Sequence, residues 1–251
     1  MVKSKTGEQS PLGGAVISQQ IAAQLLEEMR TGPYKSSSRL PAEVELASRL
    51  GVSRTVIRDA LAELEREGYV ERVRGIGTVV NRRIVTLNNR LDQKFEYSAM
   101  IRAAGFEPHA DSVSVQQIIA DSHLAHQLNI SVGDPVFMIR KRILADRTPV
   151  IYSVDYLSAN LFSKIAIDQL DFARPIFDIL EETCGISVTS TVTHVNAVNG
   201  DSAIRQTLSV ASHEALLLMD EIGFSKLAKP VMYSLSYYTN FFHFAILRKK
   251  V

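Results

Sequence analysis

Arginine and threonine side chains cluster at the start of one short amphipathic segment, RTVIRDAL. Arg54, Thr55 and Arg58 occupy its first turn and a half, on faces that its apolar residues do not use. A recognition helix uses guanidinium and hydroxyl groups at such positions to contact DNA bases and phosphates. The spacing therefore predicts a helix that can enter the major groove of DNA.

A solvated helix surface is the alternative explanation of the same charges. Arg54 and Arg58 could form ion pairs with Asp59 or Glu63, and such pairs are the commoner situation on an isolated helix. The flanking sequence favours DNA binding, because Ser53 can cap the helix and a basic turn with two glycines follows it.

Two more helices are expected to support this segment. Apolar residues recur at helical spacing between Ile17 and Met29. Pro41 opens a second helix, and Gly51 can end it in a left-handed conformation before the third helix begins. Residues 1–14 have no apolar periodicity, and we expect them to form a disordered tail.

A short basic hairpin is expected after the third helix. Residues 69–73 and 77–80 alternate in polarity as two strands do. The turn between them contains Arg74, Gly75 and Gly77, and its glycines allow close approach to a DNA groove. Helix, turn, helix and hairpin together predict a winged helix-turn-helix over residues 15–80.

These motifs resemble the winged helix-turn-helix of the GntR family: LPAE, LASRLGVSRTVIRDAL and LEREGYVERVRGIGTVV. The resemblance implies a homodimeric transcription regulator, typically a repressor, that binds double-stranded palindromic operator DNA. One departure is Val56, where many relatives carry Thr or Pro; valine cannot hydrogen-bond a phosphate but could contact a thymine methyl. The DNA-contacting positions that the resemblance implies are Arg39, Ser53, Arg54, Thr55, Arg58, Arg74, Gly75 and Gly77.

Composition agrees with a DNA-binding module joined to a second module. Residues 1–83 hold 13 Lys+Arg against 10 Asp+Glu, a balance of +3, whereas residues 84–251 hold 15 against 17, a balance of −2. The sequence has no run of about 18 apolar residues and no signal-peptide pattern. With its single cysteine, Cys184, these features predict a cytoplasmic protein that does not associate with membranes.

The remainder of the chain contains an internal repeat. Residues 81–92 have little apolar periodicity and are expected to be a linker to a second domain at 93–251. Within it, residues 121–157 resemble residues 201–238, and each copy reads as a helix followed by a β-hairpin. We therefore expect an antiparallel sheet with pseudo-two-fold symmetry and flanking helices, and a pocket where the halves meet. The whole chain is predicted to be α+β.

Two arginines on one expected strand suggest an anion site. Arg140 and Arg142 are two residues apart and so share one face of a strand, and their counterparts in the second copy are Asp220 and Ile222. Adjacent guanidinium groups bind phosphate or carboxylate bidentately. Pairing of the arginines with Asp155 or Asp146 is an equally good explanation from spacing alone.

The second domain resembles the UTRA effector-binding domain of the HutC branch of GntR regulators, which has a chorismate-lyase-like fold. The resemblance rests on YSAMIRAAGFEP, LNISVGDPVFMIRKRILADRTPVIYSVDYL and KPVMYSLSYYTNFFHFAI. It implies that an anionic small-molecule effector binds between a helix start, the R-x-R strand and the last hairpin. The effector-binding positions expected are Tyr97, Ser98, Arg140, Arg142, Ser153 and Tyr238.

The stretches after the two hairpin prolines depart from many sugar-phosphate-binding relatives. Residues 150–153 and 231–234 contain no glutamate that could bind sugar hydroxyls, and offer Tyr, Ser and Met instead. This composition favours a less polar or aromatic anion over an amino-sugar phosphate.

Two other functions remain open, whereas a metal site is not expected. The second domain could serve only for dimerisation of a constitutive regulator, or it could be a lyase-like enzyme. We find no general acid or base beside the expected anion site, and therefore expect no catalytic residue and no cofactor. His123 and His126 have a helical spacing but no third ligand, so we expect no metal site.

Overall fold

The computed structural model describes residues 11–94, 96–163 and 165–250. The chain divides into two compact units, one of Met1–Leu87 with Leu247–Val251 and the other of Asn88–Ile246. Of the segment expected to be disordered, residues 1–10 lie outside the described residues, and residues 11–14 belong to the first helix. No helix in the described part of the chain is long and apolar enough to cross a membrane.

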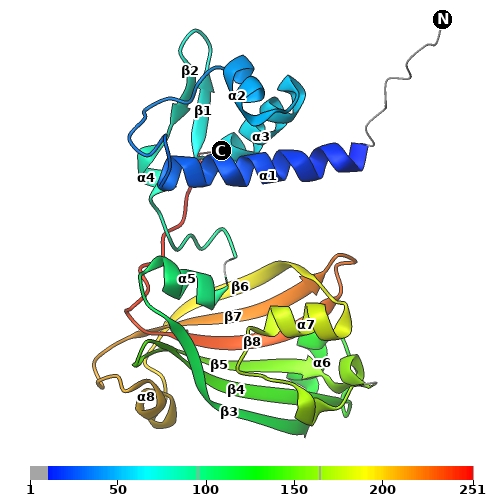
Figure 1. Ribbon diagram of the computed structural model, residues 1–251. Helices are drawn as coiled ribbons and strands as arrows, with labels where there is room; N and C mark the ends of the chain where they lie inside the picture. The colour runs from blue at the N-terminus through cyan, green and yellow to red at the C-terminus, as the bar shows by residue number, and fades with distance from the viewer. Residues whose placement is uncertain (1–10, 95, 164, 251) are drawn as a thin grey trace, which may run out of the picture. The chain divides into compact units, whose positions relative to one another are not determined.

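The first unit is a three-helix core with a two-stranded wing (Figure 1). Helices α1 and α3 pack against each other, and their buried residues, among them Leu25, Met29, Ile57 and Leu61, form one apolar core with Leu46 of α2. The elements are α1 (Pro11–Arg30), α2 (Glu43–Leu50), α3 (Arg54–Arg66), β1 (Val70–Val73), β2 (Gly77–Val80) and α4 (Arg82–Val85).

The turn between α2 and α3 forms as the sequence predicts. Gly51 has φ +67°, and its N–H donates to the carbonyl oxygen of Ala47, which ends α2. Ser53 then caps α3, because its Oγ accepts a hydrogen bond from the Val56 N–H at 3.3 Å. These two local devices fix where the first turn of α3 begins.

The second unit contains a six-stranded antiparallel sheet in the order β3-β4-β5-β8-β7-β6. The predicted α+β architecture, with a winged helix-turn-helix and an antiparallel sheet domain, is confirmed. The elements of this unit are α5 (Tyr97–Ala103), β3 (Pro108–Ile119), α6 (Ser122–Leu128), β4 (Pro135–Ala145), β5 (Thr148–Ser158), two short 3-10 helices (Ala159–Phe162 and Ile167–Gln169), α7 (Ile176–Cys184), β6 (Val188–Val198), α8 (Ser202–Leu208), β7 (Leu216–Ser225) and β8 (Pro230–Tyr238).

The internal repeat appears as two copies of helix and hairpin, α6-β4-β5 and α8-β7-β8. Asp121 and Asp201 cap the two helices through equivalent hydrogen bonds of 2.8 Å. The last strands of the copies, β5 and β8, pair at the centre of the sheet, with Val154 opposite Leu235. Because these two residues are themselves counterparts in the repeat, the predicted pseudo-two-fold axis passes between them.

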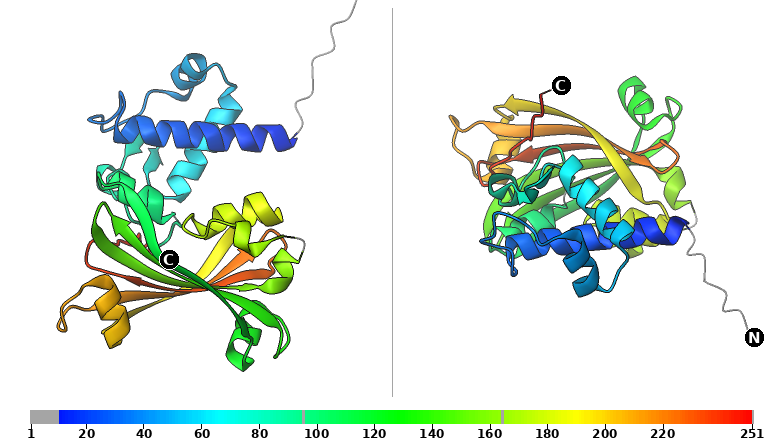
Figure 2. Two further views of the ribbon diagram at one scale, coloured as in Figure 1. Left: turned by 60° about the horizontal axis from the view of Figure 1, so that its bottom comes forward. Right: turned by 90° about the horizontal axis from the view of Figure 1, so that it is seen from above.

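The two faces of the sheet are covered by different helices (Figure 2, left). On one face, which we call the α5/α7 face, Ile139, Ile143, Ile151 and Met232 pack in the clusters that contain α5 and α7. On the opposite α6/α8 face, residues such as Tyr233 pack with α6. Side chains alternate between the faces along each strand, so a residue's position in the strand decides which helices it meets.

Candidate nucleic-acid interface and ligand site

The side chains at the start of α3 are free to contact a partner. Arg54, Thr55 and Arg58 are exposed, whereas Ile57 between them is fully buried. Among the described residues, neither arginine forms an ion pair with Asp59 or any other acid under 4.0 Å. The ion pairs with Asp59 or Glu63 that the alternative explanation names are therefore not formed.

The wing presents the remaining residues that were expected to contact DNA. Arg74 is exposed at its tip, between strands that pair from Val70–Val80 to Val73–Gly77. Gly75 and Gly77 have φ values of +79° and +101°, and no atom lies within 4 Å of the position that a Cβ would take at either. The tip is consequently narrow and open on its outer side.

Arg39 and Glu65 connect the wing to the helices. Arg39 lies beside β2 in an isolated bridge with Val79 and donates from Nη1 to the Ile76 carbonyl oxygen at 3.4 Å. Glu65, in the last turn of α3, accepts from the Arg72 N–H at 2.7 Å and from Arg72 Nε at 2.8 Å. These hydrogen bonds lower the pKa of the Glu65 carboxyl and hold the wing against the end of α3.

The expected effector-binding residues divide between the two faces of the sheet. Tyr97, Ser153 and Tyr238 belong to the α5/α7 face, whereas Arg140 and Arg142 project from the α6/α8 face. The structure therefore does not bring the arginine pair together with Tyr97. Ser98 follows Tyr97 in α5 and is half-buried.

Each arginine is involved in local interactions on its own face. Arg142 forms a bidentate ion pair with Asp111, at 2.7 and 2.6 Å, and donates to the Thr207 carbonyl oxygen in α8. This pairing lowers the pKa of Asp111. Arg140 lies near Tyr152, whose pKa is raised by burial and only partly lowered again by the arginine. Spacing left ion pairing with Asp155 or Asp146 as one of two explanations for the arginines. Arg142 does pair with an acid across the strands, but the acid is Asp111.

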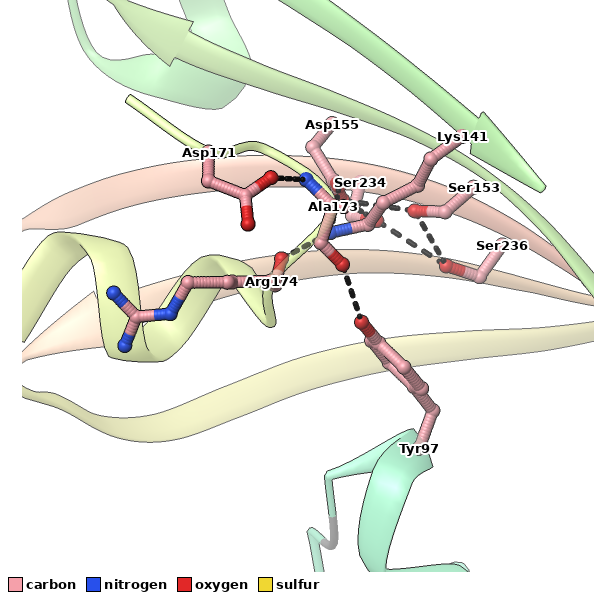
Figure 3. Close-up of polar contacts among 9 residues, drawn as sticks. All are labelled: Tyr97, Lys141, Ser153, Asp155, Asp171, Ala173, Arg174, Ser234 and Ser236. Carbon is pink, nitrogen blue, oxygen red and sulfur yellow. Dashed lines mark hydrogen bonds and ion pairs between the residues drawn. The ribbon is translucent and has the colours of Figure 1, made fainter. Parts of the chain in front are cut away.

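Lys141 is the basic residue that faces the α5/α7 side. Its side chain is 2% exposed, and burial lowers the pKa of its ammonium group. Nζ donates to the Arg174 carbonyl oxygen at 2.9 Å and lies 5.6 Å from the centre of the Tyr97 ring. Figure 3 shows Lys141 and Tyr97 converging on the segment 173–174 from the sheet and from α5.

Asp155 is the buried acid beside Lys141. Its Oδ1 accepts hydrogen bonds from Ser153 Oγ at 3.0 Å and Ser234 Oγ at 2.7 Å (Figure 3). Its Oδ2 lies 3.9 Å from Lys141 Nζ, and no hydrogen-bond donor within the described residues reaches this oxygen. A buried carboxylate oxygen in this situation is a strong acceptor for a donor that a ligand could supply.

Glu221 is the counterpart of Lys141 in the second copy of the repeat. It is 5% exposed, and its two carboxylate oxygens accept from Lys94 Nζ at 2.7 Å and Thr193 Oγ1 at 2.6 Å. The repeat therefore places a buried cation on one side of the pseudo-two-fold axis and a buried anion on the other. The two together make the α5/α7 face strongly polar near the axis.

Two neighbouring cavities open over this polar patch. A small one of about 40 Å³ is lined by Lys141, Asp155 and Ser234, and a larger one of about 630 Å³ is lined by Glu221 and Thr193. Lys94 and Tyr238 line both cavities. Burial raises the pKa of Tyr238 to about 12, so its hydroxyl is a proton donor at neutral pH.

Sequence reasoning missed Lys94, Lys141, Asp155 and Glu221 as site residues. Lys141 lies between Arg140 and Arg142, and the R-x-R pattern indicates an anion site only on the opposite face of the strand. The sequence does contain a signal for this site. The repeat aligns Lys141 with Glu221, so the charge is reversed between the two copies. The neighbouring positions on the same face of each strand are uncharged.

Histidines do not gather into a metal site in the part of the chain that the structure describes. There, no group of three or more His, Cys, Asp or Glu residues has a geometry suited to a metal ion. His123 instead places Nε2 3.2 Å from the Tyr233 hydroxyl.

Comparison with known families assigns both units. Residues 17–80 match the model for bacterial regulatory proteins of the gntR family, and residues 103–240 match the model for the UTRA domain. The chain is a GntR-family regulator with a UTRA domain. It belongs to the HutC subfamily, whose members are transcription regulators and not enzymes, with a DNA-binding helix-turn-helix and an effector-binding domain.

Relatives and solved structures agree with this assignment over most of the chain. The regulator YurK of Bacillus subtilis, described as uncharacterized, is 26% identical over 84% of this chain and 86% of its own length. The regulator GgaR of Escherichia coli is 25% identical over 83% and 81%. The crystal structure of YydK from Bacillus subtilis matches the fold with a TM-score of 0.76, at 17% identity, over 93% of this chain and 99% of YydK.

Proposed function

We propose that this UTRA-domain protein is a homodimeric repressor that binds a palindromic operator and releases it when an anionic small molecule occupies the α5/α7 face. The observation that carries the DNA-binding part is the exposed, unpaired pair Arg54 and Arg58 at the start of the capped helix α3. A repressor role is supported by a relative, the mannosyl-D-glycerate transport/metabolism system repressor MngR of Escherichia coli, which is 25% identical over 68% of this chain.

In the proposed complex, α3 enters the major groove and the wing lies along the neighbouring backbone. Arg54, Thr55 and Arg58 reach bases and phosphates, and Arg74 with the two open glycines approaches the adjacent groove. Two copies related by a two-fold axis read two half-sites, which is why the operator is a palindrome.

The proposed effector binds with Lys94, Lys141 and Asp155. Lys141 uses one of its three N–H groups on the Arg174 carbonyl oxygen, which leaves two for an anionic group of the effector. Asp155 Oδ2 needs a hydrogen-bond donor from the same ligand. The effector is thus a small anion that also carries a hydroxyl or amine group, with Tyr97 and Tyr238 as further contacts.

Release of DNA requires the effector to discriminate between two arrangements of the protein. It must bind more tightly to the arrangement in which the two DNA-binding units of the dimer do not match the half-site spacing. Operator and effector then weaken each other's binding by the same factor.

Operator binding is tested by Arg58→Ala, with Arg66→Ala in the last turn of the same helix as matched control. The operator is first selected from random DNA duplexes with the full-length protein. We expect Arg58→Ala to weaken binding roughly ten- to a hundredfold, since one good base contact contributes about 1–3 kcal/mol. Equal affinity of Arg58→Ala and the parent protein would overturn the assignment of α3 as the recognition helix.

Effector binding is tested by thermal unfolding against a panel of phosphorylated and carboxylated metabolites. Binding to the folded protein raises Tm, and we expect the shift to be lost in Asp155→Asn and kept in the double variant Arg140→Ala/Arg142→Ala. A shift that is lost only in the arginine variant would move the site to the α6/α8 face. If no anion of the panel shifted Tm, the proposed effector class would be wrong.

A further inference from the structure

The C-terminal segment of the chain contacts the end of the recognition helix. Lys249 Nζ donates to the carbonyl oxygens of Glu65 and Arg66 at 3.1 and 2.6 Å. These carbonyls belong to the last turn of α3, where the helix dipole favours a cation, and the Glu65 carbonyl also accepts from the Gly68 N–H at 3.0 Å. Lys249 therefore closes the C-terminal end of α3 as a side-chain cap.

Leu247 packs against the turn that follows α3. Gly68 in this turn has φ +82°, and a Cβ at that position would lie 2.4 Å from Leu247 Cδ2. The close approach is possible only because residue 68 is glycine. Leu247 and Lys249 also line a cavity of about 490 Å³ together with Glu65 and Gly68.

The residues just before Leu247 belong to the wall of the larger cavity of the α5/α7 face, which shares Lys94 and Tyr238 with the smaller one. Phe244 and Ile246 line the 630 Å³ cavity together with Glu221, and the Phe244 ring packs edge-on against Tyr238 at 5.3 Å. Ala245 between them is hydrogen-bonded to the linker, since its N–H donates to the Asn89 carbonyl at 2.9 Å and its carbonyl accepts from Leu91 N–H at 2.8 Å.

We propose that Leu247 and Lys249 are positioning residues that couple the larger cavity of the α5/α7 face to α3. One step along the chain from Ile246 to Leu247 leads from the cavity wall to the surface of the DNA-binding unit. A ligand that displaces Phe244 or Ile246 pulls on the segment that caps α3. The linker at Asn89–Leu91 moves with it, because Ala245 is bonded to it. The effect on operator binding rests on the proposed function. The contact of Leu247 and Lys249 with the end of α3 and Gly68, which we call docking of the segment, does not.

Docking is tested by Lys249→Met in the full-length chain. Lys250→Met is the matched control, because it removes the same charge from a neighbouring exposed residue for which the structure records no hydrogen bond. Amide hydrogen exchange is followed in the last turn of α3 and at Gly68–Tyr69. We expect exchange there to speed up at least threefold in Lys249→Met and to stay unchanged in Lys250→Met. Equal exchange in the two variants would overturn the docking.

Coupling is tested by changing the wall of the 630 Å³ cavity in chains with and without residues 247–251. Phe244→Ala and, separately, the more exposed Ile246→Ala are made in the full-length chain and in a chain that ends at residue 246. We expect each to change the affinity for the selected operator at least threefold in the full-length chain, and to have no effect in the shortened one. The same effect in both chains, or none in either, would overturn the coupling.

A second comparison uses Gly68→Ala in the same two chains. In the shortened chain it introduces only backbone strain at positive φ, whereas in the full-length chain it also expels Leu247. We expect a larger loss of operator affinity in the full-length chain, and equal losses would contradict a role for Leu247. If no DNA could be selected at all, the proposed function would fail, while the exchange measurement would still decide whether the segment docks.

Discussion

Lys141 and Asp155 form an ion pair that is almost completely withdrawn from water. Their side chains are 2% and 4% exposed, and their charged atoms are 3.9 Å apart. At that separation the pair lacks a direct hydrogen bond, so the attraction offsets only part of the desolvation of the two groups. The serines at positions 153 and 234 satisfy the other Asp155 oxygen.

Removing Lys141 alone should therefore destabilise the UTRA domain strongly. We expect Lys141→Met to lower the free energy of unfolding by about 3–5 kcal/mol, because Asp155 then stays buried without this cation. Asp155→Ser, which copies its repeat counterpart Ser236, should recover most of that loss in the double variant. Urea unfolding of the two single variants and the double variant measures the effect, and additive changes would contradict the pairing.

Residue-level prediction from the sequence was limited by the choice of sheet face. The R-x-R spacing correctly placed Arg140 and Arg142 on one face of a strand. Spacing alone could not decide which helices cover that face, because both faces of this strand are covered. Spacing indicates Asp155 only as a partner of the arginines. Its proximity to Lys141 depends on the register in which β4 and β5 pair, which the sequence does not specify.

At the scale of elements, the carboxylate of Glu65 links the last turn of α3 to the first strand of the wing. Glu65 binds both the main chain and the side chain of Arg72, the third residue of β1. The main-chain hydrogen bond is the largest cause of its lowered pKa. Orientation of the wing relative to the recognition helix thus depends on the ionised form of Glu65.

Glu65→Gln should make the first unit less stable at neutral pH but not in acid. The folded pKa of Glu65 lies below its usual value of 4.5. The carboxylate therefore stabilises the fold fully above that value, and the contribution is lost as pH falls through the folded pKa. We expect a lower Tm than the parent at about pH 7, and a difference that disappears towards about pH 3. Exposed Glu71→Gln is the control, and a pH-independent difference for Glu65→Gln would contradict this account.

Element-level prediction succeeded where local signals exist. Ser53 caps α3 as the sequence predicts, and the repeat located both hairpins. Residues 247–250 gave no such signal, because the contact between Lys249 and Glu65 joins positions that are 184 residues apart. No periodicity or capping motif encodes a contact of that kind.

At the scale of the whole molecule, charge is divided between the two modules. The N-terminal 83 residues carry a balance of +3 and the rest a balance of −2. DNA attracts the first module and repels the second, which favours binding through the proposed surface of α3 and the wing. Counterions released from the DNA by bound arginines then make the affinity depend on salt.

Arg74→Ala should reduce that salt dependence. Loss of one phosphate contact lowers the magnitude of the slope of log affinity against log salt concentration by about 1. Arg147→Ala, in the exposed turn between β4 and β5, should leave the slope unchanged. Titrations of the selected operator at several salt concentrations measure both slopes, and identical slopes for Arg74→Ala and the parent would remove the wing tip from the interface.

The modular organisation was predictable from the sequence because each module has its own motifs. What could not be predicted is that the first unit is built from both ends of the chain, Met1–Leu87 and Leu247–Val251. The expected boundaries treated the sequence as two consecutive segments with a linker at 81–92. In the structure, α4 (Arg82–Val85) belongs to the first unit, and the chain passes between the units twice.

This arrangement has a consequence for how the protein is made. A ribosome synthesises the chain from its N-terminus, and domains generally fold in that order. The helices and wing of the DNA-binding unit emerge first, yet residues 247–250, which contact the end of α3, are translated only after the whole of the second unit. A chain that stopped at residue 246 would contain every residue of the second unit but would lack the contacts of Leu247 and Lys249 with the end of α3 and the turn after it. Completion of the DNA-binding unit therefore follows synthesis of the UTRA domain.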